Sequence, residues 1–268
     1  MPAVIYEKKG HIARVTLNRP EVHNAMDAEV IVRLAETWQD FAADDSLRVA
    51  IITGAGDKAF CSGADLRRLI PLMSGARQPE DEWDHKLLEN RRLTNVALLR
   101  RFELYKPVIA AINGFCLAGG TELIQATDIR IAAQHATFGL TEVKRAIVPG
   151  GGSMVRLPRQ VPFCKAMEIL LVGDSMSAEE AHRIGLVNYV VPAGKLMETA
   201  EDFARRIAEN GPLAVRKIKE TVLKALGRPM EEGYALEDEA TRFIIRTEDA
   251  REGPRAFAEK RGPNYTGR

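Results

Sequence analysis

The sequence predicts an α/β protein that ends in a helical region. Residues 48–54 form a continuous apolar run, typical of a strand that is buried on both faces, and residues 106–112 and 128–133 are expected to be a second and a third buried strand. Loops and helix-like segments separate these runs, whereas helical periodicity dominates after residue 162, apart from one strand expected at 185–191. Because strands that alternate with helices are typical of parallel sheets, we expect a sheet-based core followed by helices.

The first segments predict a hairpin and then a capped helix. Residues 4–9 and 12–18 alternate β-branched or aromatic residues with polar ones on either side of a Gly-His turn. Asp27 is expected to cap the next helix, because its carboxylate can accept the free N–H groups of the first turn. The apolar face of that helix is formed by Ile31, Leu34, Ala35 and Trp38.

The middle of the chain predicts loops and one long helix. Residues 54–66 are expected to form a loop after the first buried strand, and residues 71–84 a mobile excursion rich in Pro, Gly and acids. A helix is expected from His85 to Leu104. The later change in pattern places a boundary near residue 200.

Composition argues against several classes of function. The chain has 38 Lys and Arg against 37 Asp and Glu, a net charge of +1, which gives no electrostatic case for nucleic acid or an anionic membrane as partner. The most apolar run, VIAAINGFCLAGG, has 13 residues and is too short to cross a bilayer. Three Cys (Cys61, Cys116, Cys164) without CxxC spacing indicate free thiols, and no signal-peptide pattern is present, so we expect a cytoplasmic protein.

Common metal, nucleophile and nucleotide motifs are missing. The five His form neither HxxxH nor HExxH, so no metal site is expected. Ser153 in GGGSMV has no neighbouring base in the sequence and lies in no GxSxG elbow. Gly54-x-Gly56-x-x-Ala59 loosely resembles a dinucleotide fingerprint, but neither the helix nor the acid that such a site needs follows it.

Two loops combine a buried strand, small residues and an expected helix start: CSGADL (61–66) and GFCLAGGTEL (114–123). N–H groups at a helix start have no partner within the helix and carry partial positive charge. Two such donors that converge on one oxygen would form an oxyanion hole. Tight turns and close packing are the alternative explanation for the glycines of either loop.

Two carboxylates accompany these loops. Glu122 lies in the first turn of the second expected helix, where a partner for the helix dipole is the alternative role. Glu142 comes 20 residues later between two turns, where a surface acid is the alternative. Paired acids in a dry cleft would hinder each other's ionisation, so one proton could be shared between them near neutral pH.

Five motifs occur in a fixed order: NRPEVHNAM, KAFCSGADL, NGFCLAGGTEL, FGLTEVKRAIVPGGGS and AEEAHRIGLVNYVV. Together with the tail REGPRAFAEKRGP they resemble the crotonase superfamily, the enoyl-CoA hydratase/isomerase family. Each motif alone is weakly specific, whereas the ordered set covers nearly the whole chain.

The resemblance implies a crotonase (ClpP-like) spiral of repeated ββα units over residues 1–200. A helical region over 201–268 would pack between subunits of a homotrimer, or of a hexamer made of two trimers, and cap the CoA. By the same resemblance the backbone N–H groups of Ala64 and Gly119 form an oxyanion hole for the thioester oxygen of an acyl-CoA. Family members often have GGG here; this chain has Ala118 in place of the first glycine and retains Gly119.

The reaction implied is the hydration of a 2-enoyl-CoA, without a cofactor beyond the CoA of the substrate. Hydratases of the family carry glutamates at both positions that match Glu122 and Glu142, here as base and acid, whereas many enoyl-CoA isomerases retain only the acid that matches Glu142. Residues 141–162 also resemble the branch that includes carnitinyl-CoA dehydratases (crotonobetainyl-CoA hydratases). Both the dehydratase and the isomerase therefore stay open as alternatives.

The resemblance further implies CoA contacts, and it leaves a non-enzymatic alternative. The CoA residues would be Ala25, Lys58, Arg67, Phe257 and Lys260, the last two within the chain or toward a neighbouring subunit. For the cations, a solvated charged face is the alternative. An RNA-binding protein on the same scaffold finds support only in residues 215–228, where five cations accompany one acid; an exposed amphipathic helix also explains that pattern.

Overall fold

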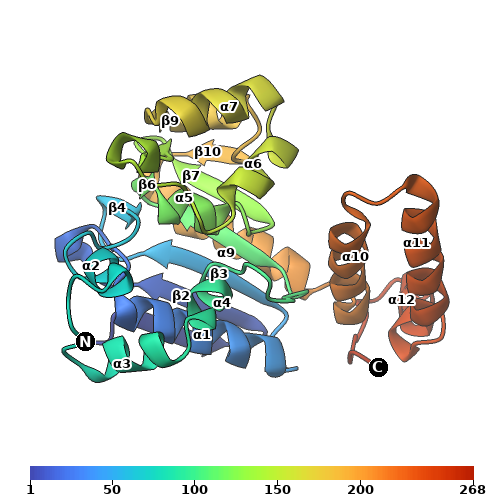
Figure 1. Cartoon of the computed structure of the whole chain (residues 1–268). Coiled ribbons are helices and arrows are strands. Elements are labelled where there is room, and N and C mark those ends of the chain that lie inside the picture. The colour runs from blue at the N-terminus through green and yellow to red at the C-terminus, as the bar shows by residue number, and fades with distance from the viewer.

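Two sheets form the body of the molecule (Figure 1). The structure, a computed structural model, describes residues 1–268. The larger sheet contains, in spatial order, β1 (Val4–Lys9), β2 (Ile12–Leu17), β3 (Val49–Gly54), β5 (Val108–Ile112), β7 (Ile129–Ala133) and β10 (Tyr189–Val191). The smaller sheet contains β4 (Ala59–Cys61), β6 (Phe115–Leu117), β8 (Thr137–Gly139) and β9 (Met176–Ser177).

Each long central strand is followed along the chain by a short strand of the other sheet. Thus β3 precedes β4, β5 precedes β6 and β7 precedes β8, and a helical segment comes after each pair. Neighbouring strands within β2-β3-β5-β7-β10 and within β4-β6-β8 are parallel, whereas β1 pairs with β2, and β9 with β8, in antiparallel fashion. This arrangement confirms the expected spiral of ββα units.

Helices cover both faces of the larger sheet. On one face α1 (Ala28–Ala43) contributes Trp38 and Phe41, both fully buried, to the main hydrophobic core. On the other face α9 (Leu196–Ala208) presents alanines at every fourth position to alternate residues of β3, β5 and β7. The central strands are therefore buried on both faces, as predicted, and small side chains let α9 approach the sheet closely.

The remaining helical segments surround this core. They are η1 (Pro20–Val22), α2 (Leu69–Ser74), α3 (Glu82–Glu89), α4 (Arg92–Ala97), α5 (Gly119–Ile124), η2 (Glu142–Arg145), α6 (Ser153–Gln160), α7 (Phe163–Val172), α8 (Ala178–Arg183), η3 (Ala193–Lys195), α10 (Pro212–Ala225), α11 (Met230–Ile244) and α12 (Glu248–Ala258). None of the helices is both long and apolar enough to cross a membrane.

The local predictions hold at the start of the chain. The hairpin forms as β1 and β2, and the Asp27 carboxylate accepts the N–H of Val30 at 3.0 Å, so it caps α1 as predicted. The segment after β3 runs into β4 rather than into a helix, which removes the dinucleotide interpretation of Gly54-x-Gly56. A side chain on Gly54 would clash with backbone oxygens of β4, so this glycine permits close strand packing.

Two predictions in the middle of the chain are wrong. The helix expected from His85 to Leu104 is two short helices: Asn90 (φ −133°, ψ 80°) leaves the helical conformation and ends α3, and the left-handed backbone of Leu99 (φ 50°) and Arg101 (φ 55°) keeps α4 from continuing to Leu104. The excursion expected at residues 71–84 contains the end of α2 and the start of α3. It is tied down by Arg77, which donates to the buried carboxylate of Asp84 at 2.7 Å.

The helices α10, α11 and α12 stand beside the body rather than on it (Figure 1). The boundary expected at residue 200 falls inside α9, which still packs on the sheet, and the chain leaves the body only at Gly211. No residue of α10 or α11 is buried, so these two helices lack a core of their own.

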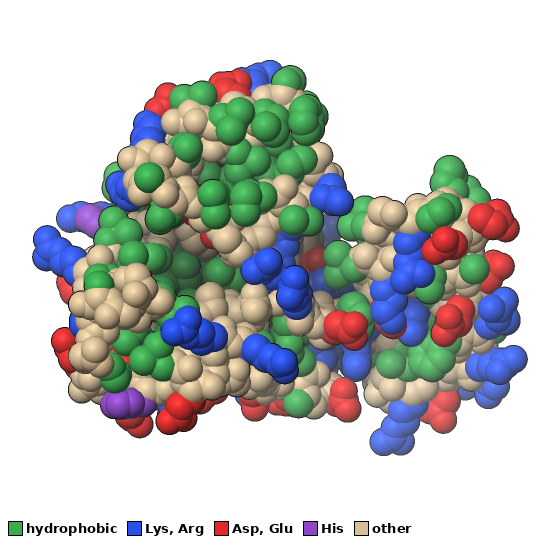
Figure 2. All heavy atoms as spheres, viewed as in Figure 1, with side chains coloured by type: hydrophobic (Ala, Val, Ile, Leu, Met, Phe, Trp, Pro, Cys, Tyr) green, Lys and Arg blue, Asp and Glu red, His purple; other side chains and the backbone are tan.

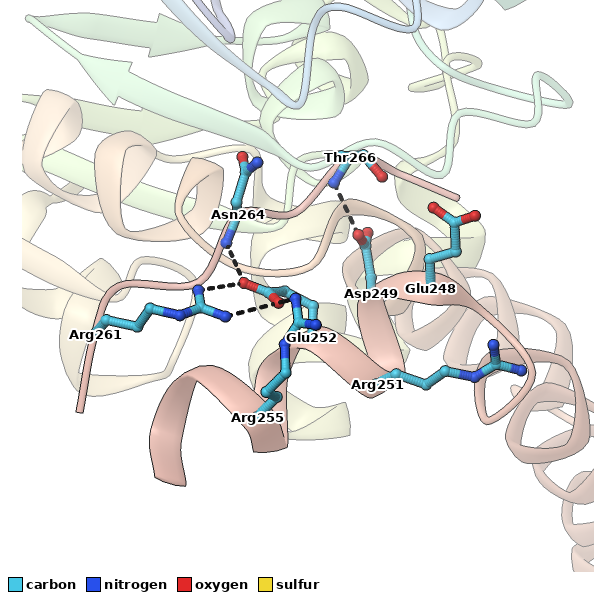
Figure 3. A pocket seen from close by; sticks show the side chains of 8 residues that line it. All are labelled: Glu248, Asp249, Arg251, Glu252, Arg255, Arg261, Asn264 and Thr266. Carbon is cyan, nitrogen blue, oxygen red and sulfur yellow. Dashed lines mark hydrogen bonds and ion pairs between the residues drawn. The ribbon is translucent and has the colours of Figure 1, made fainter. Parts of the chain in front are cut away.

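The C-terminal tail folds back along α12 and is held there by two buried carboxylates (Figure 3). Glu252 accepts hydrogen bonds from Arg261 and Arg255, each at 2.6 Å, and from the backbone N–H of Asn264 at 3.0 Å. Asp249 accepts the backbone N–H of Thr266 at 2.8 Å. The carboxylates of Glu252 and Asp249 are therefore satisfied by cations and backbone N–H groups of this hollow.

Neutralising Glu252 should release the tail. In Glu252→Gln, Arg255 and Arg261 lose their anionic partner, so trypsin is expected to cleave after Arg261 several-fold faster than in the unmodified protein, as measured by mass spectrometry over time. Glu248→Gln, which changes an exposed carboxylate outside these bonds, serves as the control. Equal cleavage rates for both variants would show that Glu252 does not hold the tail.

Candidate active site

The loop after β4 meets the loop after η1 at Ala64. Ala64 forms an isolated parallel bridge with Met26. In this bridge the N–H of Met26 donates to the carbonyl of Gly63 and the N–H of Asp65 donates to the carbonyl of Met26, each at 2.8 Å. The N–H of Ala64 is left without an acceptor in the chain. The expectation that it lies at a helix start is wrong, because α2 begins only at Leu69; the bridge leaves it free instead.

Gly119 lies next to Ala64 and is the first residue of α5. Its N–H has no acceptor within the helix, as for the first residues of any helix. A Cβ on Gly119 would lie 3.8 Å from the Ala64 nitrogen and 2.5 Å from Cε of Met26. A Cβ on Gly63 would lie 3.3 Å from the Gly119 nitrogen. The structure therefore brings the two predicted backbone donors side by side, in a space that leaves no room for side chains.

A strained turn at Ala118 sets the direction of α5. Ala118 has φ 49° and ψ −123°, a backbone conformation that typically costs a non-glycine residue about 1–3 kcal/mol. Its N–H donates to the carbonyl of Gly139 on β8 at 2.8 Å. Its methyl group faces Gly63, where an added Cβ would lie only 2.6 Å away. The departure from the family's usual glycine is accommodated because position 63 is itself glycine.

A half-buried ion network joins the two loops below Ala64. The Arg19 guanidinium donates to the Asp65 carboxylate at 3.2 Å and to the carbonyl of Ala25 at 2.6 Å, and it lies 3.2 Å from the carboxylate of Asp27. The other oxygen of Asp65 accepts the N–H groups of Arg67 and Arg68. Arg19 thus fixes the backbone on both sides of the bridge that presents the Ala64 amide.

The Glu122 carboxylate is buried against the glycine loop that opens α6. Its Oε1 accepts the backbone N–H of Ser153 at 3.3 Å. A Cβ on Gly151 would lie 2.8 Å from its Oε2, so only glycine fits there. Burial raises the pKa of Glu122, and hydrogen bonds from the backbone of residues 151–153 and from the Ser153 hydroxyl act in the opposite direction. The ionised form of this buried carboxylate is therefore supported by several donors.

The Glu142 carboxylate has the opposite environment. It is 7% exposed, and its Oε2 is buried without any hydrogen-bond partner. Burial, with a smaller contribution from the charge of Glu122, raises the pKa of Glu142 to about 7. The two glutamates are therefore close enough to influence each other's charge. The hydrogen-bond donors around Glu122 favour its charged form more than the surroundings of Glu142 favour the charged form of Glu142.

The predicted CoA residues fall into two groups. Ala25 is buried beside Met26, while Lys58 and Arg67 are exposed on either side of the Ala64 turn. Phe257 is 87% exposed at the end of α12, and Lys260 lies just beyond it. Because α12 stands on the opposite side of the molecule from β4 and α2, a single chain does not bring these two residues to the others (Figure 1).

Sequence reasoning missed several residues that hold Glu122 or the loop of Ala64. Ser153 was set aside because no base adjoins it in sequence, whereas the fold places it against Glu122, 31 positions away. Gly151 and the Arg19–Asp65 pair were likewise not singled out. The run of three glycines before Ser153 was the available signal, because consecutive glycines expose backbone N–H groups that can bind an anion.

The whole chain is similar to proteins of one family. Residues 7–268 match the family described as Enoyl-CoA hydratase/isomerase. The chain is 39% identical over 267 residues to the enoyl-CoA hydratase EchA19 of Mycobacterium tuberculosis, covering 100% of this chain and 97% of that protein. It is 40% identical over 265 residues to a carnitinyl-CoA dehydratase of Salmonella typhi, covering 97% of each. The crystal structure of an enoyl-CoA hydratase from Bacillus anthracis matches with a TM-score of 0.90 at 38% identity, covering 99% of this chain and 100% of that one.

The raised pKa of Glu142 predicts a pH-dependent loss of stability. Because the folded pKa of about 7 exceeds the ordinary value of 4.5, the stability linked to the neutral carboxyl is complete below pH 4.5 and is lost as the pH rises through 7. The difference between these two pKa values corresponds to a loss of about 3 kcal/mol of stability at most. Glu142→Gln, which cannot ionise, should therefore gain in stability relative to the unmodified protein between acid and mildly alkaline pH, as measured by urea unfolding.

The control is Glu231→Gln, which removes an exposed carboxylate of α11. Its stability relative to the unmodified protein should be independent of pH over the same interval. A Glu142→Gln variant that shows the same flat comparison would contradict the assignment of a neutral Glu142.

Proposed function

Because the chain belongs to the enoyl-CoA hydratase/isomerase family, as its motifs indicated, we propose that it adds water reversibly to a 2-enoyl-CoA thioester. One observation carries this proposal: two buried glutamates that differ in their hydrogen-bond donors lie close enough for their charges to interact. The fold also places two unpaired backbone amides side by side. Addition of water needs a base and an acid together with stabilisation of a developing oxyanion. The hollow seen below α6 and α7 in Figure 2, lined largely by hydrophobic side chains, offers space for an acyl group.

The proposed reaction uses each group once. The thioester oxygen accepts the N–H groups of Ala64 and Gly119, which stabilise negative charge on that oxygen. Glu122 takes a proton from a water molecule while the water oxygen bonds to the β-carbon and the double-bond electrons move toward the thioester oxygen. Glu142 then delivers its proton to the α-carbon as the enolate collapses, which gives a 3-hydroxyacyl-CoA. Proton exchange with solvent restores both carboxyl groups, and no cofactor takes part.

The alternatives differ in chemistry or in acyl group. An isomerase needs only one carboxyl group to move a proton, so the donors assembled around Glu122 favour hydration. A carnitinyl-CoA dehydratase would use the same groups on a substrate that carries a quaternary ammonium. A cavity of about 330 Å³ on the outer side of the 149–152 loop is lined by Arg100, Arg101 and Arg156. These cations would repel such a substrate if its head group entered there, so we favour an uncharged or anionic acyl group.

RNA binding loses its support. The five cations of residues 215–228 each form an ion pair: Arg216 with Asp45, Lys217 and Lys224 with Glu220, Lys219 with Asp128, and Arg228 with Glu232. A phosphate backbone would have to compete with these carboxylates. Local pairs of Lys217, Lys224 and Arg228, together with the pairs that Arg216 and Lys219 form with the body, therefore explain the pattern.

We further propose that the active unit is a homotrimer, alone or paired into a hexamer, in the cytoplasm. α10 and α11 bury no residue, and an isolated pair of this kind is marginal in water. The body carries a separate apolar surface over α6 and α7 (Figure 2), which includes Val155, Phe163 and Leu171. When a chain has two different apolar surfaces, one surface can pack against the other surface of the next copy, and such head-to-tail contacts can close into a ring. In such a ring, Phe257 and Lys260 could contact CoA bound to a neighbouring subunit.

Loss of either glutamate should abolish most turnover. Glu122→Gln and Glu142→Gln are each expected to lower kcat by about 10²–10⁴-fold, because each removes one proton transfer, while acyl-CoA still binds. The loss of conjugated-thioester absorbance is followed, and the product of the unmodified enzyme is identified by mass. A gain of one water supports the proposal. An unchanged mass with a moved double bond indicates an isomerase, and free CoA indicates a hydrolase. Unchanged hydration by Glu122→Gln would refute its role.

A charge on the apolar face of α10 should break the assembly. Ile218, 65% exposed in the single chain, is expected to be covered in the oligomer. Ile218→Asp should therefore sediment as smaller species in analytical ultracentrifugation, whereas Ile218→Leu should keep the mass of the unmodified protein. An unmodified protein that sediments as a monomer would overturn the proposed assembly but not the proposed reaction.

A further inference from the structure

We infer that Ser153 and Gln125 are positioning residues that orient the Glu122 carboxylate and keep it ionised while Glu142 stays protonated. This inference rests on the proposed function, in which Glu122 is the base. Neither residue is expected to touch the substrate. Both would act through hydrogen bonds that end on the carboxylate.

Three buried residues from two helices are joined by hydrogen bonds, through the hydroxyl of Ser153 on one side and its backbone N–H on the other. Glu122 and Gln125 lie three residues apart, within and at the end of α5, so they share one side of the helix. Ser153 is the first residue of α6 and lies between them. The Gln125 Nε2 donates to Ser153 Oγ at 3.0 Å, and the Ser153 N–H donates to Glu122 Oε1 at 3.3 Å. The exposed fractions are 2% for Gln125, 0% for Ser153 and 5% for Glu122.

The carboxylate fixes the direction of the hydrogen bonds. An ionised carboxylate can only accept, whereas a serine hydroxyl has one proton to donate and can also accept. Because Gln125 donates to the Ser153 oxygen, the serine proton stays free for Glu122. Hydrogen bonding to that hydroxyl opposes the rise in the pKa of Glu122 that burial causes. The other end of the amide, Oε1 of Gln125, is buried without a partner. Turning the amide round would place its oxygen against Ser153 and draw the serine proton away from Glu122.

The backbone of Gln125 is itself fixed, which makes the amide a rigid donor. Its carbonyl accepts Nε2 of Gln160 from α6 at 2.8 Å and Nη2 of Arg130 from β7 at 3.2 Å. Gln125 is thus held from two elements, and its side chain has one buried direction in which to donate. Because Gln125 is fixed in this way, its hydrogen bond to Ser153 is part of a buried network and not an isolated contact.

The charged groups around Glu122 explain why such support is needed. Glu142 faces it from η2, and Arg156 from α6 interacts with its charge while also lying near Arg100. Burial disfavours ionisation of both glutamates, and their mutual repulsion lets only one ionise readily. Arg156 is half-buried and donates to the carbonyls of Leu98 and Leu99, and it forms no hydrogen bond with Glu122. Donors on Glu122, with none on Glu142 Oε2, decide which glutamate loses its proton.

The first test compares pH profiles of kcat and KM for hydration of crotonyl-CoA. Ser153→Ala should move the acidic limb of kcat upward by about one pH unit, the effect of losing one hydrogen bond to a charged group, and Gln125→Leu, which removes the donor to Ser153, should move the limb in the same direction. At pH values below the limb, kcat of Ser153→Ala should be about tenfold lower than kcat of the unmodified protein at the same pH, while KM changes little. Ser153→Thr, which keeps the hydroxyl, should restore the original limb. A uniform loss of kcat at every pH, with the limb in place, would overturn the inference.

The second test needs no turnover. Carbon-13 NMR of glutamate carboxyl groups in the unmodified protein, assigned with Glu122→Gln and Glu142→Gln, follows the two titrations. Glu122 should ionise at lower pH than Glu142. The reverse order would overturn the inference even if the enzyme hydrates its substrate. If Glu122 ionises at lower pH than Glu142 but the protein hydrates no enoyl-CoA, the role of the hydrogen bonds is supported and the proposed function is refuted.

Discussion

The candidate site depends on backbone N–H groups that the fold leaves without carbonyl partners. A bridge to Met26 leaves the Ala64 amide free, the start of α5 frees that of Gly119, and the glycine loop before α6 turns its amides onto Glu122. Unpaired amides are costly when buried, so each must meet an anion or solvent. The parallel strands place these loops at the same end of the two sheets. The chemistry therefore follows from where strands end and helices begin.

The same feature gives the two glutamates different properties although they are chemically identical. Glu122 meets donors from three successive residues, whereas one oxygen of Glu142 meets none. Burial alone would raise the pKa of both and leave their roles undefined. The difference lies in the loop that faces Glu122 and not in either glutamate. Exchanging roles between the two would require the loop to be rebuilt, so the assignment of base and acid belongs to the architecture.

Much of the fold could be predicted because local patterns determine it. Apolar runs marked β3, β5 and β7, alternation marked the hairpin, and Asp27 capped α1 as its position indicated. The helix expected between His85 and Leu104 is broken at Asn90, which has non-helical backbone, and it ends before Leu99 and Arg101, whose positive φ no propensity predicts. The contact of Ser153 with Glu122 spans a whole ββα unit and left no local signal except a run of glycines. Local secondary structure could therefore be predicted from the sequence, whereas contacts between residues far apart in the chain could not.

The strained turn at Ala118 has a consequence for how the protein acquires its site. That backbone conformation is unfavourable in an isolated chain, and here it persists because β8 accepts its amide and Gly63 leaves room for its methyl. A chain in which the smaller sheet has not yet closed has nothing to hold the turn, so the neighbouring amide of Gly119 would point elsewhere. Partly folded molecules would therefore be catalytically silent, and only a completed fold would engage a reactive thioester.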